Sequence, residues 1–361
     1  MIEPICRVAD TVVATQMRTG RFWPWTWGPA LFGAAALQVD PERYGPWADA
    51  WLEHHVARGP RPDQSDRIAP GLVLAARLDE TRPAWREVAQ AMADQVHAEP
   101  LLPGARARGA TVTNHLGQSA IGRLYPRSVW VDSLMMLGVF TARWGRLTGD
   151  EALLERAATM PTAYAALLHD ASGLWHHCWW DGARHPVGPG VFWGRGNGWV
   201  VASLPMICEE LRLAGGFDTE IARIGELLQR TSEALLTRQR VDGWFSTLLE
   251  EPQRPEASAT SLIGAGWLHA IELGLLDERF AEPALRAIGA VDATIQWRVG
   301  PDGLRQWSLP GISGPTIPIP GLTAAGYRAV PMGRDHSYGI AAHLWAAYRT
   351  ERYGTLTSLG R

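Results

Sequence analysis

Six stretches of the chain are apolar nearly all the way round a helix and rich in small residues. The 3.6-residue period is clearest in residues 129–140 and 198–207. A helix that is apolar on every side is usually buried on every side. The six segments lie near residues 27–38, 68–79, 129–144, 198–211, 259–274 and 338–350.

Six amphipathic, more charged segments alternate with the apolar ones. They lie near residues 3–18, 46–57, 82–97, 150–168, 219–236 and 279–298. Helices of this kind bury one face and expose the other to water. The alternation predicts an all-α fold, an (α/α)6 barrel of six inner and six outer helices. An open two-layer helical solenoid is the main alternative, and we favour the closed ring because six pairs fill it.

The linkers before the later inner helices also repeat. Asp170, Asp242 and Asp302 each open a turn that leads into a short strand-like piece, and other strand signals are equally short. If the inner helices run parallel, these linkers and the helix N-termini meet at one end, where helix dipoles favour an anionic ligand. No composition shift marks a boundary, so we expect a single barrel domain over 1–361, with 310–321 as a candidate lid.

Composition and charge exclude several classes of protein. The 361 residues carry a net charge of -3, which offers no polycation for nucleic acid, and no apolar run is long enough to span a membrane. The start of the chain has no basic region followed by an apolar stretch, and the three cysteines are odd in number and scattered. We therefore expect reduced thiols and a cytoplasmic protein, a monomer or a homodimer.

Tryptophan is unusually frequent, with 18 Trp against 7 Tyr and 7 Phe. Part of this number is expected to fill the core. The remainder stands beside Gly, Pro or Asp in loop-like stretches, where flat aromatic faces can pack against the apolar faces of sugar rings. The predicted sugar-contacting tryptophans near the starts of inner helices are Trp27, Trp130, Trp193 and Trp199.

Two aspartates stand near the starts of predicted inner helices. Asp132 follows a predicted helix start at Ser128 and has mostly apolar neighbours. An acid near a helix N-terminus is often only a favourable charge, but burial of Asp132 among apolar side chains should raise its pKa and make it a general acid. Asp66 by itself reads as a helix cap, and as a second carboxylate it would complete a glycosidase pair.

The segment 193–199 reads Trp-Gly-Arg-Gly-Asn-Gly-Trp and opens the fourth inner helix. Its glycines let the backbone approach a ligand closely, and Arg195 could clamp a carboxylate bidentately, with Asn197 beside it. The spacing is not that of a dinucleotide-binding fingerprint. A purely structural glycine turn is the less favoured interpretation.

Three further acidic or imidazole positions carry weaker signals. His176 and His177 are adjacent, and adjacent side chains rarely reach one ion, so no metal site is predicted. Asp181 is as well explained by a turn as by catalysis. Glu256 opens the fifth inner helix, where capping alone would account for it.

These motifs together resemble the unsaturated rhamnogalacturonyl hydrolases and unsaturated glucuronyl hydrolases, glycoside hydrolase families 105 and 88. The matching stretches begin at Asp66, Tyr125, Gly173, Phe192 and Glu256, and run in family order between about 24 and 270. The resemblance implies an (α/α)6 barrel that removes an unsaturated uronic acid from the non-reducing end of a lyase-generated oligosaccharide. It implies no metal or organic cofactor.

The resemblance also implies roles for single residues. The catalytic Asp of the family falls on Asp132 and its second Asp on Asp66, whereas a sugar-contacting His falls on His177 or His176. Its Trp and Arg fall on Trp193 and Arg195. The implied reaction is a hydration, in which Asp132 protonates C4 of the double bond and helps water add at C5.

Two other functions remain open at this point. An inverting glycosidase acting on saturated uronosides would use the same carboxylate pair with a water between them. A sugar-binding barrel without catalysis would keep the fold but would not depend on Asp132 or Asp66.

Overall fold

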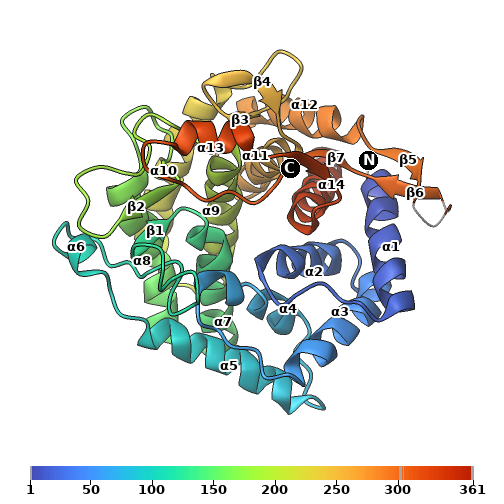
Figure 1. Ribbon diagram of the computed structural model, residues 1–361, viewed down its shortest axis with the longest axis horizontal. Helices are drawn as coiled ribbons and strands as arrows, with labels where there is room; N and C mark the ends of the chain where they lie inside the picture. Colours follow the sequence, from blue (N-terminus) through green and yellow to red (C-terminus); the bar gives the residue numbers. More distant parts are fainter. Residues whose placement is uncertain (1, 301–302, 304, 359–361) are drawn as a thin grey trace.

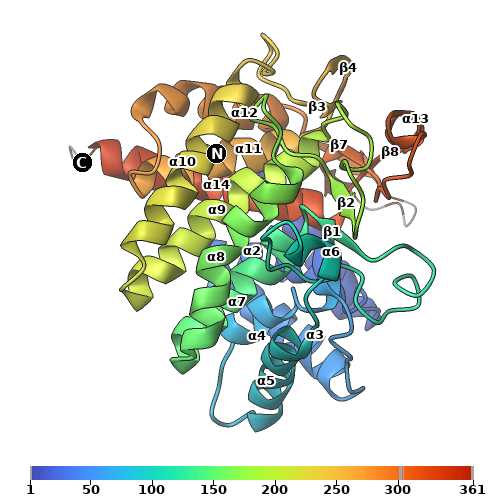
Figure 2. The same cartoon turned by 90° about the vertical axis from the view of Figure 1, so that its left-hand side faces the viewer.

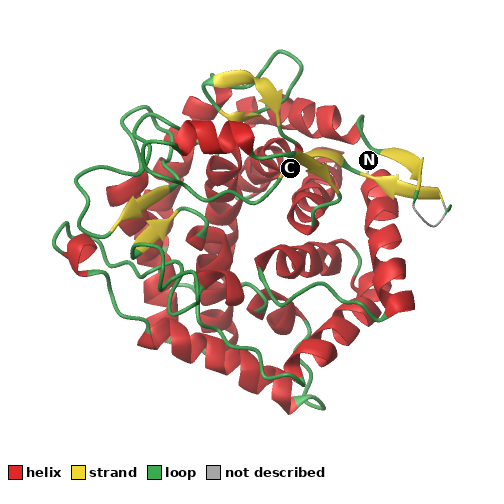
Figure 3. Ribbon diagram, in the orientation of Figure 1, coloured by secondary structure: helices red, strands yellow, loops and turns green. Residues whose placement is uncertain are grey.

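The computed structural model describes residues 2–300, 303 and 305–358, and helices dominate it (Figure 3). Six helices pack successively against one another and close into a ring. These inner helices are α2 (Trp27–Val39), α4 (Gly71–Ala76), α7 (Val139–Thr148), α9 (Gly194–Ala214), α11 (Ala257–Glu272) and α14 (Ser337–Ser358).

A second set of helices surrounds this ring, as Figure 1 shows. The outer helices are α1 (Ile2–Thr19), α3 (Pro41–Val56), α5 (Pro83–Ala98), α8 (Glu151–Leu168), α10 (Asp218–Leu236) and α12 (Ala281–Asp292). Each outer helix packs on one or two inner helices. The predicted (α/α)6 barrel of six inner and six outer helices is confirmed in the described part of the chain.

Burial explains why the two sets differ in sequence. Every residue of α11 from Ala257 to Ala270 is buried, because neighbours cover this helix on all sides. In α10 the buried residues recur at helical spacing, as at Ile221, Ile224 and Leu228, and the remaining face meets water. The apolar segments of the sequence therefore correspond to the inner helices, and the amphipathic segments correspond to the outer helices.

Short elements fill the connections. The eight strands pair within the described residues into four two-stranded antiparallel sheets, as the short strand signals predict. The pairs are β1 (Ser128–Trp130) with β2 (Cys178–Trp180), β3 (Ser246–Leu248) with β4 (Glu251–Pro255), β5 (Gln296–Val299) with β6 (Arg305–Ser308), and β7 (Pro310–Ser313) with β8 (Met332–Arg334). The short helices are η1 (Ser65–Arg67), α6 (Pro103–Arg106), η2 (Leu134–Gly138), η3 (Glu278–Phe280) and α13 (Thr323–Ala329). Figure 2 shows most strands and α13 on one side of the barrel.

The third inner helix begins later than predicted. The segment 128–130 forms β1, whose backbone pairs with β2, so Ser128 is a strand residue and not a helix cap. Asp132 consequently lies in the turn that joins β1 to η2. The sixth outer helix also ends early, at Asp292, and Asp302 lies outside the described residues.

No described helix is both long and apolar enough to cross a membrane. The three cysteines are free and buried.

Candidate active site

The inner helices bring their N-termini to one end of the barrel. Trp27, at the start of α2, stacks on Tyr338 at the start of α14, with 4.7 Å between ring centroids. Arg195, in the first turn of α9, lies 4.8 Å from the centre of the same tyrosine ring and 3.7 Å from Glu256, the N-cap of α11. The inner helices therefore run parallel, and their positive dipole ends share one mouth.

Backbone hydrogen bonds connect the linkers at this mouth. The amide of Ser65 donates to the carbonyl of His115, and the amide of His115 donates to the carbonyl of Ser128, each over 2.9 Å. The amide of Val131 donates to the carbonyl of His177, also over 2.9 Å. Three linkers that are distant in sequence are thereby held side by side, each next to a titratable side chain.

The first of these side chains is Asp132, which faces His177. Their Oδ2 and Nε2 atoms are 3.0 Å apart, and the side chain of Asp132 is 13% exposed. Neither of these two buried atoms has a well-aligned hydrogen bond within the described residues. Poor alignment is common for catalytic groups without substrate, and it leaves both atoms ready for a ligand.

Asp66 forms a second acid–imidazole contact. Its Oδ1 atom lies 3.5 Å from Nε2 of His115, a residue that is buried. Nδ1 of His115 is 2.8 Å from the hydroxyl of Ser133, the residue that follows Asp132. The ring of Trp130 stacks on His115 with 4.9 Å between centroids. The two aspartates thus belong to one connected cluster at the mouth.

The two carboxyl groups have opposite pKa shifts. Burial raises the pKa of Asp66 to about 7, and the negative charge of Asp132 adds to this effect. Burial lowers the pKa of His115 to about 4, so this imidazole is neutral beside Asp66. Asp66 consequently holds its proton for much of the time at neutral pH.

The expected raised pKa of Asp132 is wrong. Burial does act to raise it, but the contact with His177 outweighs burial and lowers the pKa of Asp132 below its usual range. Asp132 is therefore ionised at neutral pH. The proton-holding carboxyl that the sequence assigned to Asp132 is found at Asp66 instead.

Arg195 binds the protein itself in this structure. It donates to the carbonyl and hydroxyl oxygens of Ser313 over 2.9 and 2.7 Å and to the carbonyl of Gly314 over 2.8 Å. Its side chain is only 1% exposed. The guanidinium therefore holds the loop after β7 against α9, and its predicted contact with a substrate carboxylate stays a prediction.

The other residues of the glycine-rich segment are also buried. Asn197 donates to the carbonyls of Trp175 and Trp193 and accepts from the amide of Trp175. Trp193 lies under His177, with 4.3 Å between the ring centroids, and is itself buried. Trp199 is fully buried. Asn197, Trp193 and Trp199 therefore support the wall of the site, and their predicted sugar contacts stay predictions.

The remaining predicted residues divide between the site and its surroundings. Trp130 contacts the rings of both site histidines, and Trp27 is half-buried at the mouth. His176 turns the other way, with Nε2 3.6 Å from Asp170. Of the two adjacent histidines, His177 is therefore the one at the site.

The two acidic residues with weaker sequence signals, Asp181 and Glu256, accept hydrogen bonds within the protein. Asp181 accepts from the amide of Gly104 over 2.8 Å and from Arg127 over 3.1 Å. Glu256 is fully buried and accepts from the amide of Ala259 at the start of α11. Neither side chain is directed to the pair of aspartates by these contacts.

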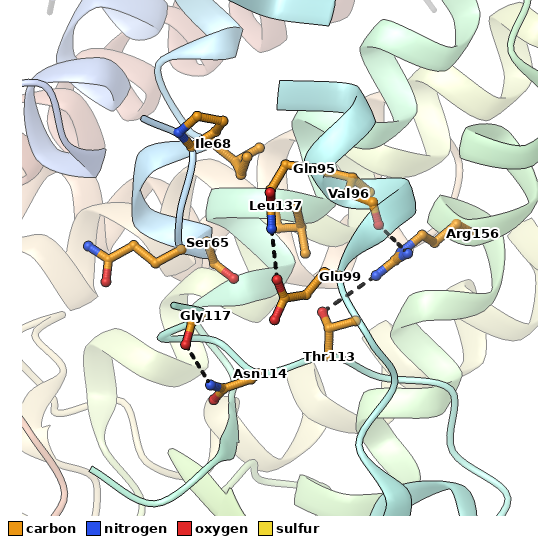
Figure 4. Close-up of a pocket in the computed structure, with 12 residues that line it drawn as sticks. Ser65, Ile68, Gln95, Val96, Glu99, Thr113, Asn114, Gly117, Leu137 and Arg156 are labelled. Carbon is orange, nitrogen blue, oxygen red and sulfur yellow. Dashed lines mark hydrogen bonds between the residues drawn. The ribbon is translucent and has the colours of Figure 1, made fainter. Parts of the chain in front are cut away.

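A small cavity lies behind the mouth (Figure 4). Ser65 and Asn114, the neighbours of Asp66 and His115, line one side of it, and Glu99 and Arg156 line another. Its volume of about 20 Å³ has room for about one water molecule, so it cannot hold a sugar. We also find no group of three or more His, Cys, Asp or Glu placed to hold a metal ion in the described part of the chain.

Comparison with known proteins now identifies the family. The Glycosyl Hydrolase Family 88 profile matches residues 3–354. The chain belongs to this family.

Several relatives are similar to this family 88 member. The unsaturated rhamnogalacturonyl hydrolase YesR of Bacillus subtilis is 26% identical over 343 residues, which cover 93% of this chain and 92% of YesR. An unsaturated 3S-rhamnoglycuronyl hydrolase of Alteromonas sp. is 32% identical over 189 residues, 49% of this chain and 45% of that protein.

Solved structures share the fold. A possible GH105 member from Klebsiella pneumoniae gives a TM-score of 0.78 at 24% identity, covering 91% of this chain and 82% of its own. The unsaturated glucuronyl hydrolase of Bacillus sp. GL1 gives 0.72 at 18% identity, covering 98% and 97%. The chain is thus a glycoside hydrolase with the (α/α)6 barrel of its family.

One residue at the family 88 site was missed by the sequence. Tyr327, in α13, places its hydroxyl group against Nδ1 of His177 and is buried. No periodicity marks it, and it follows the candidate lid in a part of the chain that matches the family motifs only loosely. The role of His115 was likewise not predicted, because its contact with Asp66 depends on linkers that meet only in the fold.

Proposed function

We propose that this glycosidase removes a 4,5-unsaturated uronic acid from the non-reducing end of oligosaccharides that polysaccharide lyases release. The observation that carries the proposal is the pair Asp66 and Asp132, which share one mouth and have opposite pKa shifts. The names of the relatives, unsaturated rhamnogalacturonyl and rhamnoglycuronyl hydrolase, support the same substrate class. The parallel N-termini of the inner helices favour the carboxylate of a uronic acid at this end.

The two protonation states divide the reaction between the carboxyl groups. Protonated Asp66 donates its proton to C4 of the double bond, and ionised Asp132 takes a proton from the water whose oxygen bonds to C5. The hemiketal at C5 then opens as its bond to the ring oxygen breaks. The resulting hemiacetal at C1 releases the shortened saccharide and leaves a keto-uronate. General acid and base help of this kind is worth about 10²- to 10⁴-fold each.

This assignment differs from the one that the family resemblance alone implies, in which Asp132 performs both steps. The contact with His177 favours the anion of Asp132, and the anion of Asp132 in turn favours the proton on Asp66. A protonated acid beside an ionised base is the arrangement that addition of water to a double bond requires. His177 and His115 are the partners that keep the two states apart.

The decisive experiment pairs unsaturated substrates with their saturated counterparts. Galacturonyl and glucuronyl disaccharides, each with and without the double bond, are incubated with the enzyme in heavy water. We expect the ultraviolet absorbance of the double bond to disappear, the neutral sugar to be released, and deuterium to enter the product at C4. Release from the saturated disaccharides without carbon-bound deuterium would instead establish a glycosidase of saturated uronosides, whose inversion the anomeric configuration of the first product would show, and binding without release a non-catalytic barrel.

The cellular location and the oligomeric state of the protein stay predictions. The three free, buried cysteines support a reducing compartment, and we infer a cytoplasmic enzyme that acts as a monomer or homodimer.

A further inference from the structure

The hydroxyl group of Tyr327 approaches the active site from a part of the chain that is 150 residues away from its partner. It meets Nδ1 of His177, whose other nitrogen, Nε2, lies 3.0 Å from Asp132. The three side chains form a line from α13, through the linker before β2, to the turn before η2. Tyr327 is only 1% exposed, so water does not compete for this contact.

Two contacts fix the segment that carries Tyr327. Arg254 in β4 donates to the carbonyls of Tyr327 over 3.2 Å and of Val330 over 2.7 Å, and it also contacts the carbonyl of Arg328. The hydroxyl of Tyr125 donates to the carbonyl of Pro318 over 2.6 Å. The loop between β7 and α13 is therefore held at Pro318, and α13 is held at its C-terminal end.

We propose that Tyr327 is a positioning residue, which donates its hydroxyl proton to Nδ1 of His177 and thereby keeps the ring proton on Nε2, facing Asp132. The proposal rests on the proposed function only for what Asp132 does; the geometry of the three side chains stands without it. Tyr327 touches neither Asp132 nor Asp66 in the contacts seen here, so its influence passes through the imidazole.

The carboxylate and the tyrosine hydroxyl favour the same neutral form of the imidazole. With the proton on Nδ1, the lone pair of Nε2 would face a carboxylate oxygen at 3.0 Å, and two acceptors would repel each other. With the proton on Nε2, a donor faces the carboxylate and Nδ1 becomes an acceptor for the tyrosine. Burial, followed by the charge of Asp132, raises the pKa of Tyr327 well above its usual value, so the phenol keeps the proton that it must donate.

Other titratable groups surround this line of three residues. Asp66, His115 and Arg195 approach from the neighbouring helix starts, and Cys178 and Tyr125 from the strand β2 and the linker before β1. Burial and the Asp132 charge raise the pKa of Cys178 in the direction of the neutral thiol. We therefore expect the tyrosine hydroxyl to act together with the Asp132 carboxylate in setting the tautomer of His177.

The test removes the hydroxyl group and leaves the ring. Tyr327→Phe should lower kcat about 10- to 100-fold and leave KM within about twofold, a smaller loss than a general acid or base would give. The matched control is Tyr353→Phe, which removes a hydroxyl bonded to Glu278 on the surface and should leave both constants unchanged. Thermal unfolding of each variant shows whether the fold is retained.

A spectroscopic readout separates positioning from mere support of the structure. Nitrogen-15 shifts of His177 should show the Nε2–H form in the wild-type enzyme and a mixture of both tautomers in Tyr327→Phe. Arg254→Met, which leaves the hydroxyl but frees α13, should give the same mixture with a smaller loss of kcat. If Tyr327→Phe keeps the wild-type tautomer, or lowers stability without changing the tautomer, the proposal is overturned.

The two proposals can fail separately. Wild-type enzyme that turns over no unsaturated uronide contradicts the proposed function, whatever the tautomer of His177. Wild-type enzyme that turns over such substrates but carries the Nδ1–H form contradicts the positioning role of Tyr327 alone.

Discussion

The two ends of the barrel treat acidic side chains differently. At the mouth, the partners of Asp66 and Asp132 are the histidines His115 and His177. At the opposite end, where the inner helices finish, the glutamates have arginines as partners. Figure 2 shows these helix ends on the side away from the strands and α13.

The arginine pairs at this rear end are short and mostly buried. Glu210 of α9 accepts from Arg143 and Arg146 of α7, each over 2.6 Å. Glu272 of α11 accepts from Arg349 of α14 over 2.7 Å and also contacts Arg352. Both glutamates join neighbouring inner helices.

Glu209 lies at the rear end but has both a histidine and an arginine as partners. His269 lies 3.2 Å from it and Arg349 lies 3.7 Å from it. Burial acts to raise the pKa of Glu209, but His269, followed by Arg349 and Arg143, lowers it to about 2. With arginines added to the histidine, this carboxylate stays ionised at every physiological pH.

The comparison shows that acidic side chains serve two purposes in this barrel, depending on their partners. An arginine keeps its charge and locks its carboxylate in the ionised state, which suits a link between helices. The buried, neutral His115 leaves Asp66 free to hold or release a proton, which suits catalysis. Proton exchange is therefore expected only at the mouth, and four substitutions test this division.

The largest effect is expected for Asp132→Asn. This change keeps the shape of the side chain but removes the base, so kcat/KM on an unsaturated disaccharide should fall about 10²- to 10⁴-fold. The matched control is Asp181→Asn, which alters a carboxylate bonded to Arg127 and to a backbone amide. We expect the control to keep near-normal kcat/KM, and a near-normal rate in Asp132→Asn would refute its role.

A somewhat smaller and pH-dependent effect is expected for Asp66→Asn. Because Asp66 must be protonated to donate, wild-type kcat/KM should fall as the pH rises through about 7, the pKa of this group. The variant should be about 100-fold slower below that pH and should lose the alkaline limb of the profile. If the limb persists in Asp66→Asn, another group carries the proton, and the division of roles between the two aspartates is wrong.

The barrel could be predicted from the sequence because the burial of each helix determines the spacing of its apolar residues. The apolar segment near 259–274 and the amphipathic segment near 219–236 correspond to α11 and α10 almost residue for residue. Asp66, Asp132 and His177 were also predicted, since local motifs carry them. Each of these signals lies within a single stretch of the chain.

The electrostatic state of the site could not be predicted in the same way. The pKa of Asp132 depends on His177 and that of Asp66 on Asp132, and both contacts join linkers that only the fold brings together. The same holds for Arg195, whose hydrogen bond to Ser313 joins two segments that are distant in the sequence. Burial alone, the one effect visible in the sequence, gave the wrong sign for Asp132.

Glu272→Gln should act on stability and not on activity. It leaves the buried guanidinium of Arg349 with only Glu209, 3.7 Å away, as an ionised partner, which should lower the free energy of unfolding by about 2 kcal/mol, since the pair with Glu272 is not fully buried. kcat/KM should stay within about twofold of wild type. The control Glu282→Gln, in an exposed pair with Arg286, should change stability by less than about 0.5 kcal/mol. A large loss of kcat/KM in folded Glu272→Gln would contradict the division into a catalytic mouth and a structural rear end of the barrel.

The smallest effect is expected for Glu209→Gln, and its pH dependence has a definite sign. The folded-state pKa of about 2 lies below the usual value of 4.5, so ionised Glu209 contributes stability that is complete above about 4.5 and is lost as the pH falls toward about 2. The side chain is 36% exposed, so solvent screening reduces this contribution to about 1 kcal/mol.

Denaturant unfolding of wild type and Glu209→Gln at two pH values measures this contribution. The difference in unfolding free energy should be about 1 kcal/mol near pH 6 and should shrink near pH 3, where the wild-type carboxylate begins to be protonated. Asp66→Asn should behave in the opposite way, because the folded-state pKa of Asp66 is raised to about 7. Its ionised form is disfavoured by folding, so the substitution should increase stability above pH 7 and have little effect near pH 4. If both substitutions changed the unfolding free energy in the same direction above pH 7, the acidic residues at the mouth and at the rear end would be stabilised in the same protonation state.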